Sequence, residues 1–198
     1  MHFGLLIGYP LFVHLGTLYS LPILHFIALV MLVSGLCYER LKAFKISSWL
    51  WFLAVSCSAL GAYYLEAAIY LLFIPPIIVP LLLFWVFGLT LLPGHTPLIT
   101  QIGQQARGPL TAEMCRYTRR ITQLWSLCFF LIALNATLLS WLASMELWSL
   151  FTNVITYVFV GALFIGEFVY RKYRFPMHDH PSFLEYLRIV FKSPIRKA

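Results

Sequence analysis

Three arginines near the middle of the chain are the residues best suited to chemistry. Arg116, Arg119 and Arg120 stand at positions i, i+3 and i+4, so a helix presents them on one face. A guanidinium fork suits bidentate contact with an oxyanion, and the three side chains are candidates to bind a phosphate of a lipid head group or of an acidic carrier protein's prosthetic arm. The alternative is that they rest on anionic lipid and only orient the chain.

Glu167 is a second candidate, because it is the one carboxylate inside an expected membrane span. An acid within the membrane is a candidate for function, but Arg171 follows at i+4, where a local ion pair is also favoured. Acid–base catalysis by Glu167 would need a partner, and His95 and His178 are weak candidates for that role. The sequence signatures of α/β-hydrolases, P-loop proteins, dinucleotide-binding proteins and zinc peptidases are missing.

Other polar residues also fall within the expected spans. His14 and His25 are about equally far from an expected turn at 19–20, so they could pair, relay a proton or ligate a metal. The alternative is two neutral imidazoles that are hydrogen-bonded to neighbouring helices. Asn135 and Asn153 suit hydrogen bonds between helices.

Metal binding is a poor explanation for any of these residues. His178, Asp179 and His180 supply ligands only on a flexible loop, whereas a zinc site needs at least three converging ligands. The four cysteines have no C-x-x-C spacing. We therefore expect no metal and no cofactor.

The elements that position these residues are expected to be membrane helices. Hydrophobic residues make up 61% of the chain and charged residues 11%, whereas soluble domains carry roughly 25% charge. We predict an all-α polytopic bundle that forms one integral membrane domain, 1–198. Six spans are expected, near 3–18, 21–37, 48–65, 67–92, 121–143 and 148–170.

Two of these spans rest on local signals. Residues 3–37 are long for one span and short for two, and Ser20-Leu21-Pro22 favours a hairpin of two, because the residue before a proline avoids helical geometry. The chain start lacks the basic residues of a secretory signal, so we expect this apolar stretch to be retained. Pro75, Pro76 and Pro80 predict a kink or unwound segment in the fourth span.

The charges predict an orientation. All 14 lysines and arginines fall in alternate polar segments. They are Arg40, Lys42 and Lys45; Arg107, Arg116, Arg119 and Arg120; and Arg171, Lys172, Arg174, Arg188, Lys192, Arg196 and Lys197. By the positive-inside rule, the loop 93–120, the tail 171–198 and both termini are cytoplasmic. This distribution explains the net charge of +7 without a nucleic-acid partner.

Two amphipathic surface helices are expected on the cytoplasmic side. The first lies near 97–106. Thr111 is then a plausible N-cap, with Glu113 in the first turn, for a helix that continues into the fifth span. The second surface helix follows Ser182 in the tail, where Ser182 and Glu185 have capping-box spacing. Residues 145–147 are expected to form a short connection between the last two spans.

Several segments resemble a known family. They are LLPGHTPLI, GPLTAEMCRYTRRITQLW, LWSLFTNVITY and GEFVYRKYRFPMHDHPSFLEYLR, and they cover roughly 85–190. They are similar to recurrent blocks of small bacterial inner-membrane proteins that are often encoded among genes for aryl-polyene (xanthomonadin-like) pigment lipids. The resemblance implies an inner-membrane location and a pathway setting. It implies no catalytic residue.

The leading functional hypothesis is a non-catalytic inner-membrane accessory protein that assists the biosynthesis or transfer of an aryl-polyene-type lipid. Its expected partners are membrane lipids and, at the arginines, an acidic acyl carrier protein or another pathway enzyme. One alternative is a membrane-embedded enzyme that modifies an acyl or lipid substrate. Another is a small transporter or flippase subunit, which at this chain length would need to form an oligomer.

Overall fold

The computed structural model describes residues 3–64 and 68–175, and the elements in these residues are helices, as predicted. Four helical segments are long and apolar enough to cross a membrane: Pro22–Lys42, Tyr70–Leu89, Ala112–Leu142 and Met145–Arg174. Two apolar helices are shorter, Gly4–Leu18 and Ile46–Gly61. The described chain is thus all-helical and has the apolar helices of a membrane protein. His178 and the expected tail helix after Ser182 lie outside the described residues.

The chain divides into two compact units. Unit 1 comprises 1–79 and 132–159, and unit 2 comprises 80–131 and 160–198. Helices α4 (Ala68–Leu89), α6 (Ala112–Leu142) and α8 (Thr156–Arg174) each contribute residues to both units.

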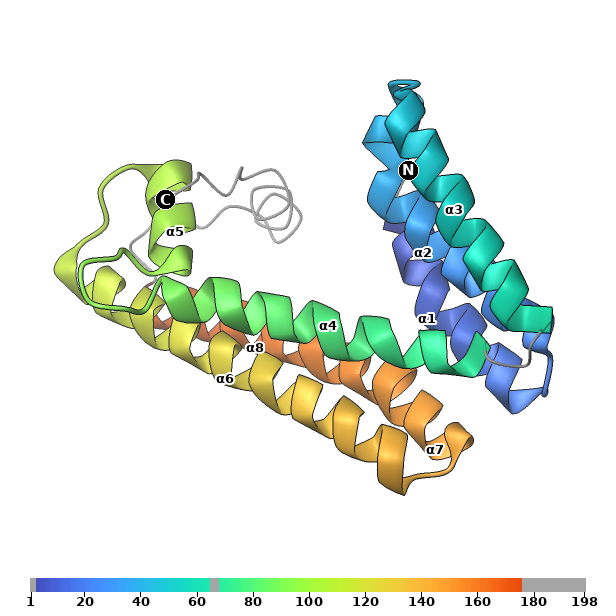
Figure 1. The fold of residues 1–198 in the computed structure, drawn as a ribbon. Helices are drawn as coiled ribbons and strands as arrows, with labels where there is room; N and C mark the ends of the chain where they lie inside the picture. Colours follow the sequence, from blue (N-terminus) through green and yellow to red (C-terminus); the bar gives the residue numbers. More distant parts are fainter. Residues whose placement is uncertain (1–2, 65–67, 176–198) are drawn as a thin grey trace. The chain divides into compact units, whose positions relative to one another are not determined.

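Unit 1 begins with three helices, α1 (Phe3–Leu18), α2 (Pro22–Lys42) and α3 (Ile46–Tyr64). α2 lies beside both α1 and α3 (Figure 1). The chain reverses at Ser20, which has a left-handed φ of 51°, and Pro22 then starts α2, a position that tolerates its missing N–H. The expected helical hairpin is confirmed.

The expected end of the second helix near residue 37 is wrong. α2 extends to Lys42, and it carries Arg40 and Lys42 in its last turn rather than in a loop. Basic side chains are favourable there, because the carboxyl end of a helix carries partial negative charge.

Helix α4 continues through its prolines without an unwound segment. Of the two predicted outcomes, a kink or an unwound segment, the second is therefore wrong. Pro76 has no N–H to donate to the carbonyl of Leu72, four residues earlier. The Tyr9 hydroxyl of α1 donates to that carbonyl instead, at 3.4 Å, and Tyr9 and Leu72 are both buried. A neighbouring helix therefore replaces the backbone bond that the proline removes.

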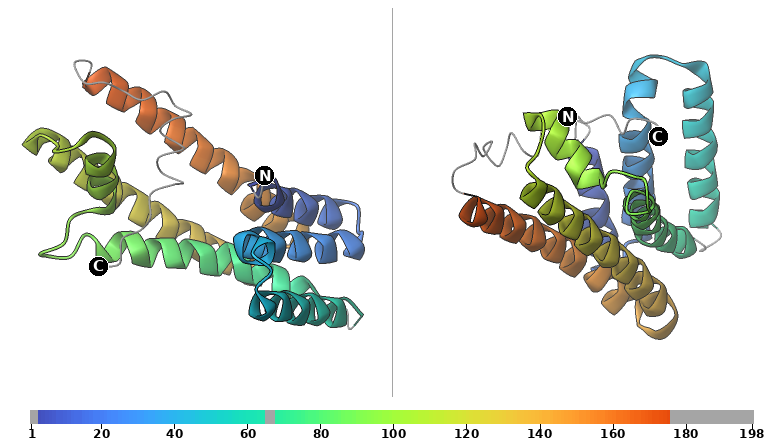
Figure 2. Two further views of the ribbon diagram at one scale, coloured as in Figure 1. Left: turned by 90° about the horizontal axis from the view of Figure 1, so that it is seen from above. Right: turned by 90° about the vertical axis from the view of Figure 1, so that its left-hand side faces the viewer.

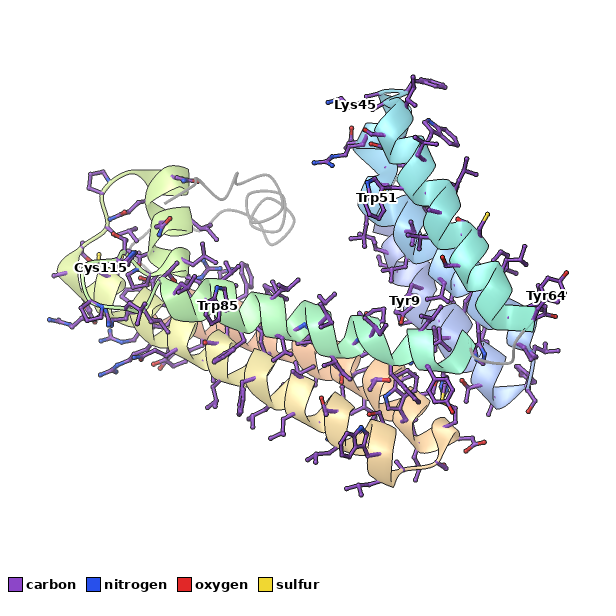
Figure 3. All side chains as sticks on the ribbon, in the orientation of Figure 1. Tyr9, Lys45, Trp51, Tyr64, Trp85 and Cys115 are labelled. Atoms are coloured by element: carbon purple, nitrogen blue, oxygen red, sulfur yellow. The ribbon has the colours of Figure 1, made fainter. Side chains whose placement is uncertain are left out.

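The core of unit 1 is centred on Trp148, which is 1% exposed. The Phe73 and Trp148 rings meet edge to face, with centroids 4.8 Å apart. The other buried core residues are Tyr9, Val13, Ala28, Leu29, Ala59 and Leu72. Figure 3 shows Tyr9 among the side chains of this unit.

The expected connection at 145–147 is also wrong. These residues form the start of α7 (Met145–Leu150), which the π-helix η1 (Phe151–Ile155) and α8 follow directly. The physical reason is a helix cap: the Ser144 side chain accepts a hydrogen bond from the Leu147 N–H, and Glu146 lies in the first turn.

Unit 2 contains parts of three helices, of which α6 runs antiparallel to both α4 and α8. Phe84 and Phe87 of α4 contact Phe130 and Phe129 of α6, with centroids 5.4 and 5.1 Å apart. On the α8 side, the Trp125 and Phe164 rings have centroids 4.5 Å apart. These aromatic pairs hold α6 between α4 and α8.

Helix α5 (Leu98–Arg107) confirms the helix expected near 97–106, and it lies beside the first turns of α6 in both views of Figure 2. Its first N–H groups lack intrahelical acceptors. The hydroxyls of Thr90 and Thr122 accept from the N–H groups of Leu98 and Ile99, at 3.0 and 3.4 Å. Leu98 is buried inside the protein, although it was expected on a membrane-facing surface.

The cap of α6 agrees with the sequence. The Thr111 hydroxyl accepts from the Met114 N–H at 3.3 Å, and Glu113 lies in the first turn. The helix then continues for 31 residues, about 46 Å at a rise of 1.5 Å per residue. This exceeds a hydrocarbon core of about 30 Å, so both an arginine-bearing first part and a spanning part fit on one helix.

Candidate functional site

Unit 2 has a cavity of about 210 Å³ between the first turns of α6 and the last turns of α8. Its charged lining residues are Glu113, Arg116, Arg120 and Arg174, and its aromatic lining residues are Tyr117, Tyr170 and Phe175. We call this cavity the arginine pocket. Figure 3 shows nitrogen atoms gathered at the end of unit 2 where Cys115 is labelled.

The structure divides the predicted arginine cluster. Arg116 and Arg120, one helical turn apart, line the arginine pocket, and neither has an acidic partner among the described residues. Arg119 lies apart from them, and its Nη2 donates to the Leu91 carbonyl at 3.0 Å. Within the described residues, two of the three arginines are therefore available to an anion, while the third joins the segment that follows α4 to α6.

Sequence reasoning missed the third arginine of the pocket, Arg174. Its guanidinium forms an ion pair with Glu113, which joins the end of α8 to the start of α6. It also lies over the Phe175 ring, 5.5 Å from the centroid. The expected antiparallel packing of the last two long helices could have predicted this contact. Such packing brings the first turn of α6 beside the last turn of α8.

The aromatic residues form one wall of the arginine pocket. Tyr117 and Tyr170 stack with centroids 6.0 Å apart and planes inclined by 22°. Phe175 meets Tyr117 edge to face at 5.3 Å. The pocket therefore presents guanidinium groups beside flat apolar faces, a combination that suits an anionic group attached to an organic body.

Glu167 lies behind this wall rather than in it. The Tyr117 hydroxyl donates to Glu167 Oε1 at 3.1 Å, and Arg171 Nε lies 3.4 Å from the same oxygen. The side chains of Arg171 and Glu167 are 14% and 5% exposed, so the pair is largely removed from solvent. The ion pair expected at i+4 is confirmed, and Tyr117 links the pair to the arginine pocket.

The histidines proposed as catalytic partners are not brought to Glu167 within the described chain. His95 lies in the loop before α5, and its Nδ1 is 3.3 Å from the Pro93 carbonyl. His178 lies outside the described residues. An acid–base pair with Glu167 therefore gains no geometric support from His95.

His14 and His25 bind separate hydroxyls in unit 1. His14 Nδ1 lies 3.2 Å from Ser149 Oγ of α7, and His25 Nε2 lies 3.2 Å from Thr17 Oγ1 of α1. Gly16 makes room for the second ring, since a Cβ there would lie 2.7 Å from His25 Cδ2. These contacts match hydrogen bonding to neighbouring helices rather than a histidine pair.

The two asparagines have different environments. Asn153 is buried in η1, and its Nδ2 donates to Thr152 Oγ1 at 3.2 Å. Asn135 is exposed on α6 and makes no hydrogen bond to another described residue, so the bond between helices expected of it is not present there. No group of three or more potential metal ligands occurs in 3–64 or 68–175.

Comparison with protein-family models, with curated proteins and with solved structures found no match to this chain. The fold and composition define its class as an all-helical protein with apolar helices able to span a membrane.

Proposed function

We propose that this protein is a non-catalytic membrane accessory protein that holds the anionic end of a lipid-like molecule in the arginine pocket. The observation that carries the proposal is the pair Arg116 and Arg120, which face a cavity without an acidic partner among the described residues. Two exposed like charges one turn apart on a helix repel each other, and a bound anion relieves that repulsion.

The aromatic wall supports an amphiphilic ligand. Tyrosine has an apolar ring and a polar hydroxyl, and it is enriched where a membrane meets water. Tyr170 and Tyr117 offer such faces beside the guanidinium groups. Within this proposal, the resemblance to proteins encoded with aryl-polyene genes makes an intermediate of such a lipid, free or on an acidic acyl carrier protein, the biological ligand.

The same proposal includes a bacterial inner-membrane location and six spans with both termini in the cytoplasm. The basic residues at the end of α2, in the first turns of α6 and at the end of α8 support this orientation through the positive-inside rule. The arginine pocket then lies at the cytoplasmic surface, within reach of a carrier protein and of lipid head groups.

The test is lipid profiling of a deletion strain that is complemented with variants. Replacing Arg116 and Arg120 with glutamine (R116Q/R120Q) removes two guanidinium groups from the lining of the pocket. We expect the aryl-polyene-type lipid to fall at least tenfold, because charge-assisted contacts to the anion are lost. The amount of the variant in the membrane should be unchanged.

The matched control is R119Q/K172Q, which removes two positive charges from the same end of unit 2 outside the arginine pocket. We expect near wild-type lipid in this control. Wild-type lipid in R116Q/R120Q, or an equal loss in both double variants, contradicts the proposal.

An enzymatic function is a second candidate, because the buried Glu167 contacts a lining residue of the pocket. In that case Glu167→Gln abolishes product even when the amount of folded protein in the membrane is unchanged, whereas the accessory function retains product per amount of folded protein. The same lipid profile separates the two candidates.

A transporter or flippase subunit remains the third candidate. It would use the polar residues of unit 1, including His14 and His25. Movement of lipid across liposomes by the purified protein would favour it over the accessory function.

A further inference from the structure

We infer that the ligand group of the arginine pocket is a phosphate monoester. This inference rests on the proposed function and names the chemistry of its anion. Among the ligands of that proposal, it selects a molecule with a terminal phosphate over a carboxylate and over a phosphodiester, which is the form of phosphate in a carrier protein's prosthetic arm.

The first argument is charge. Arg116, Arg120 and Arg174 bring three positive charges to the lining and Glu113 brings one negative charge, which leaves an excess of two. A phosphate monoester carries about 1.5 to 2 negative charges near pH 7, whereas a phosphodiester or a carboxylate carries one. Of these anions, the monoester neutralises the pocket most completely.

The second argument is the arrangement of donors. Arg174 is already oriented by its ion pair with Glu113, while Arg116 and Arg120 are not engaged by an acid among the described residues. A terminal phosphate has three acceptor oxygens, so it can accept from several guanidinium forks at once. A carboxylate has two oxygens, and a diester has only two unesterified ones.

The third argument is space. Liquid water occupies about 30 Å³ per molecule, so a cavity of about 210 Å³ has the volume of several waters. A phosphate group and a few attached atoms fit within it, while a long chain must continue outside. An exposed face of α8 that contains Ala162, Gly166 and Tyr170 at four-residue spacing leads away from the pocket, and a Cβ on Gly166 would meet no atom within 4 Å.

The experiment measures binding to the full-length protein purified in a neutral maltoside detergent. Four probes are titrated: dioctanoyl phosphatidic acid (a monoester), dioctanoyl phosphatidylglycerol (a diester), glycerol 3-phosphate and inorganic phosphate. We expect phosphatidic acid to bind at least tenfold more tightly than phosphatidylglycerol. R116Q/R120Q should remove this preference, and R119Q/K172Q should retain it, with thermal unfolding as the check of folding.

The water-soluble probes identify the source of the phosphate. Phosphatidic acid binding well above glycerol 3-phosphate supports a lipid monoester, while equal binding supports a soluble monoester, and both outcomes sustain the inference. Equal affinity for phosphatidic acid and phosphatidylglycerol overturns it, as does a failure of phosphatidic acid to bind.

These outcomes are distinct from failure of the proposed function. If both lipids bind with equal affinity and R116Q/R120Q loses the binding of both, the arginine pocket binds anions but the monoester inference is wrong. If R116Q/R120Q leaves the cellular lipid profile unchanged, the accessory function falls whichever probe binds.

Discussion

At the scale of single residues, Tyr117 has two roles. Its ring forms part of the arginine-pocket wall, and its hydroxyl reaches Glu167 on α8. Glu167 also pairs with Arg171, in surroundings where charges are largely removed from solvent. Removing one partner from a buried charged group lowers the free energy of unfolding. Tyr117 therefore supports the pocket in two ways, through its ring in the wall and through its hydrogen bond to Glu167.

Deleting this hydroxyl provides a direct test. Tyr117→Phe should lower the free energy of unfolding by about 1.5–3 kcal/mol, the usual range for a hydrogen bond to a charged group. The measurement is unfolding of the purified protein in detergent. Tyr170→Phe is the matched control, because Tyr170 is 55% exposed and has no hydroxyl bond among the described residues. Equal effects of the two changes would refute this role for Tyr117.

Sequence reasoning predicted some of these residues and missed others. Arg116, Arg120 and Glu167 stood out by residue type and helical spacing, and the ion pair of Glu167 with Arg171 follows from their i, i+4 positions. Glu113 and Arg174 are 61 residues apart, and their contact depends on the packing of α6 against α8. A local pattern carries no information about such a pair.

At the scale of elements, hydroxyl groups fix α5 to α6. Thr100 and Thr118 are both buried, and their hydroxyl oxygens lie 2.7 Å apart. Thr122 is fully buried and accepts from the Ile99 N–H. The face of α5 that sequence analysis assigned to the membrane surface is thus partly used for packing within unit 2.

A double-mutant cycle measures this attachment. Thr118→Val leaves the buried Thr100 hydroxyl without its partner, so it should destabilise the protein by about 1–2 kcal/mol. Thr100→Val should destabilise it by less, because the Thr118 hydroxyl keeps its hydrogen bond to the Met114 carbonyl. The double variant should lose less free energy of unfolding than the sum of the losses in the two single variants, with a coupling energy of about 1 kcal/mol. Thr137→Val on α6 is the control, since the Thr137 hydroxyl donates to a carbonyl of its own helix. Additive effects of the two changes would show that these hydroxyls do not interact.

Capping residues predict where a helix begins, and hydropathy alone does not. Thr111 and Glu113 correctly predict the start of α6. Ser144 and Glu146 are the same kind of signal for α7, which begins within the segment that hydropathy alone predicts as a connection. The π-helix at 151–155 had no recognised signal, since a wider turn depends on packing rather than on local residue type.

At the scale of the whole molecule, the number of spans and their orientation remain predictions. α1 has 16 residues, about 24 Å at 1.5 Å per residue, which is shorter than an average hydrocarbon core of about 30 Å. A short helix is tolerated where the bilayer thins locally. The turn at Ser20 between α1 and α2 excludes a single continuous helix over 3–37.

Reporter fusions test the orientation. Green fluorescent protein at either terminus should fluoresce, because both ends are expected in the cytoplasm. Alkaline phosphatase should be active when fused after Ser144 and inactive when fused after Pro109, since basic segments remain inside. An active phosphatase after Pro109 would mean that the arginine pocket faces the other side of the membrane.

The hydrogen bond from Tyr9 to the Leu72 carbonyl has a consequence for biogenesis. Chains are made from the amino end, so the donor on α1 leaves the ribosome before the proline helix that needs it. Once α4 enters lipid, no water is present to solvate the carbonyl that Pro76 leaves free. The first helix therefore carries the donor for this carbonyl before α4 has been synthesised.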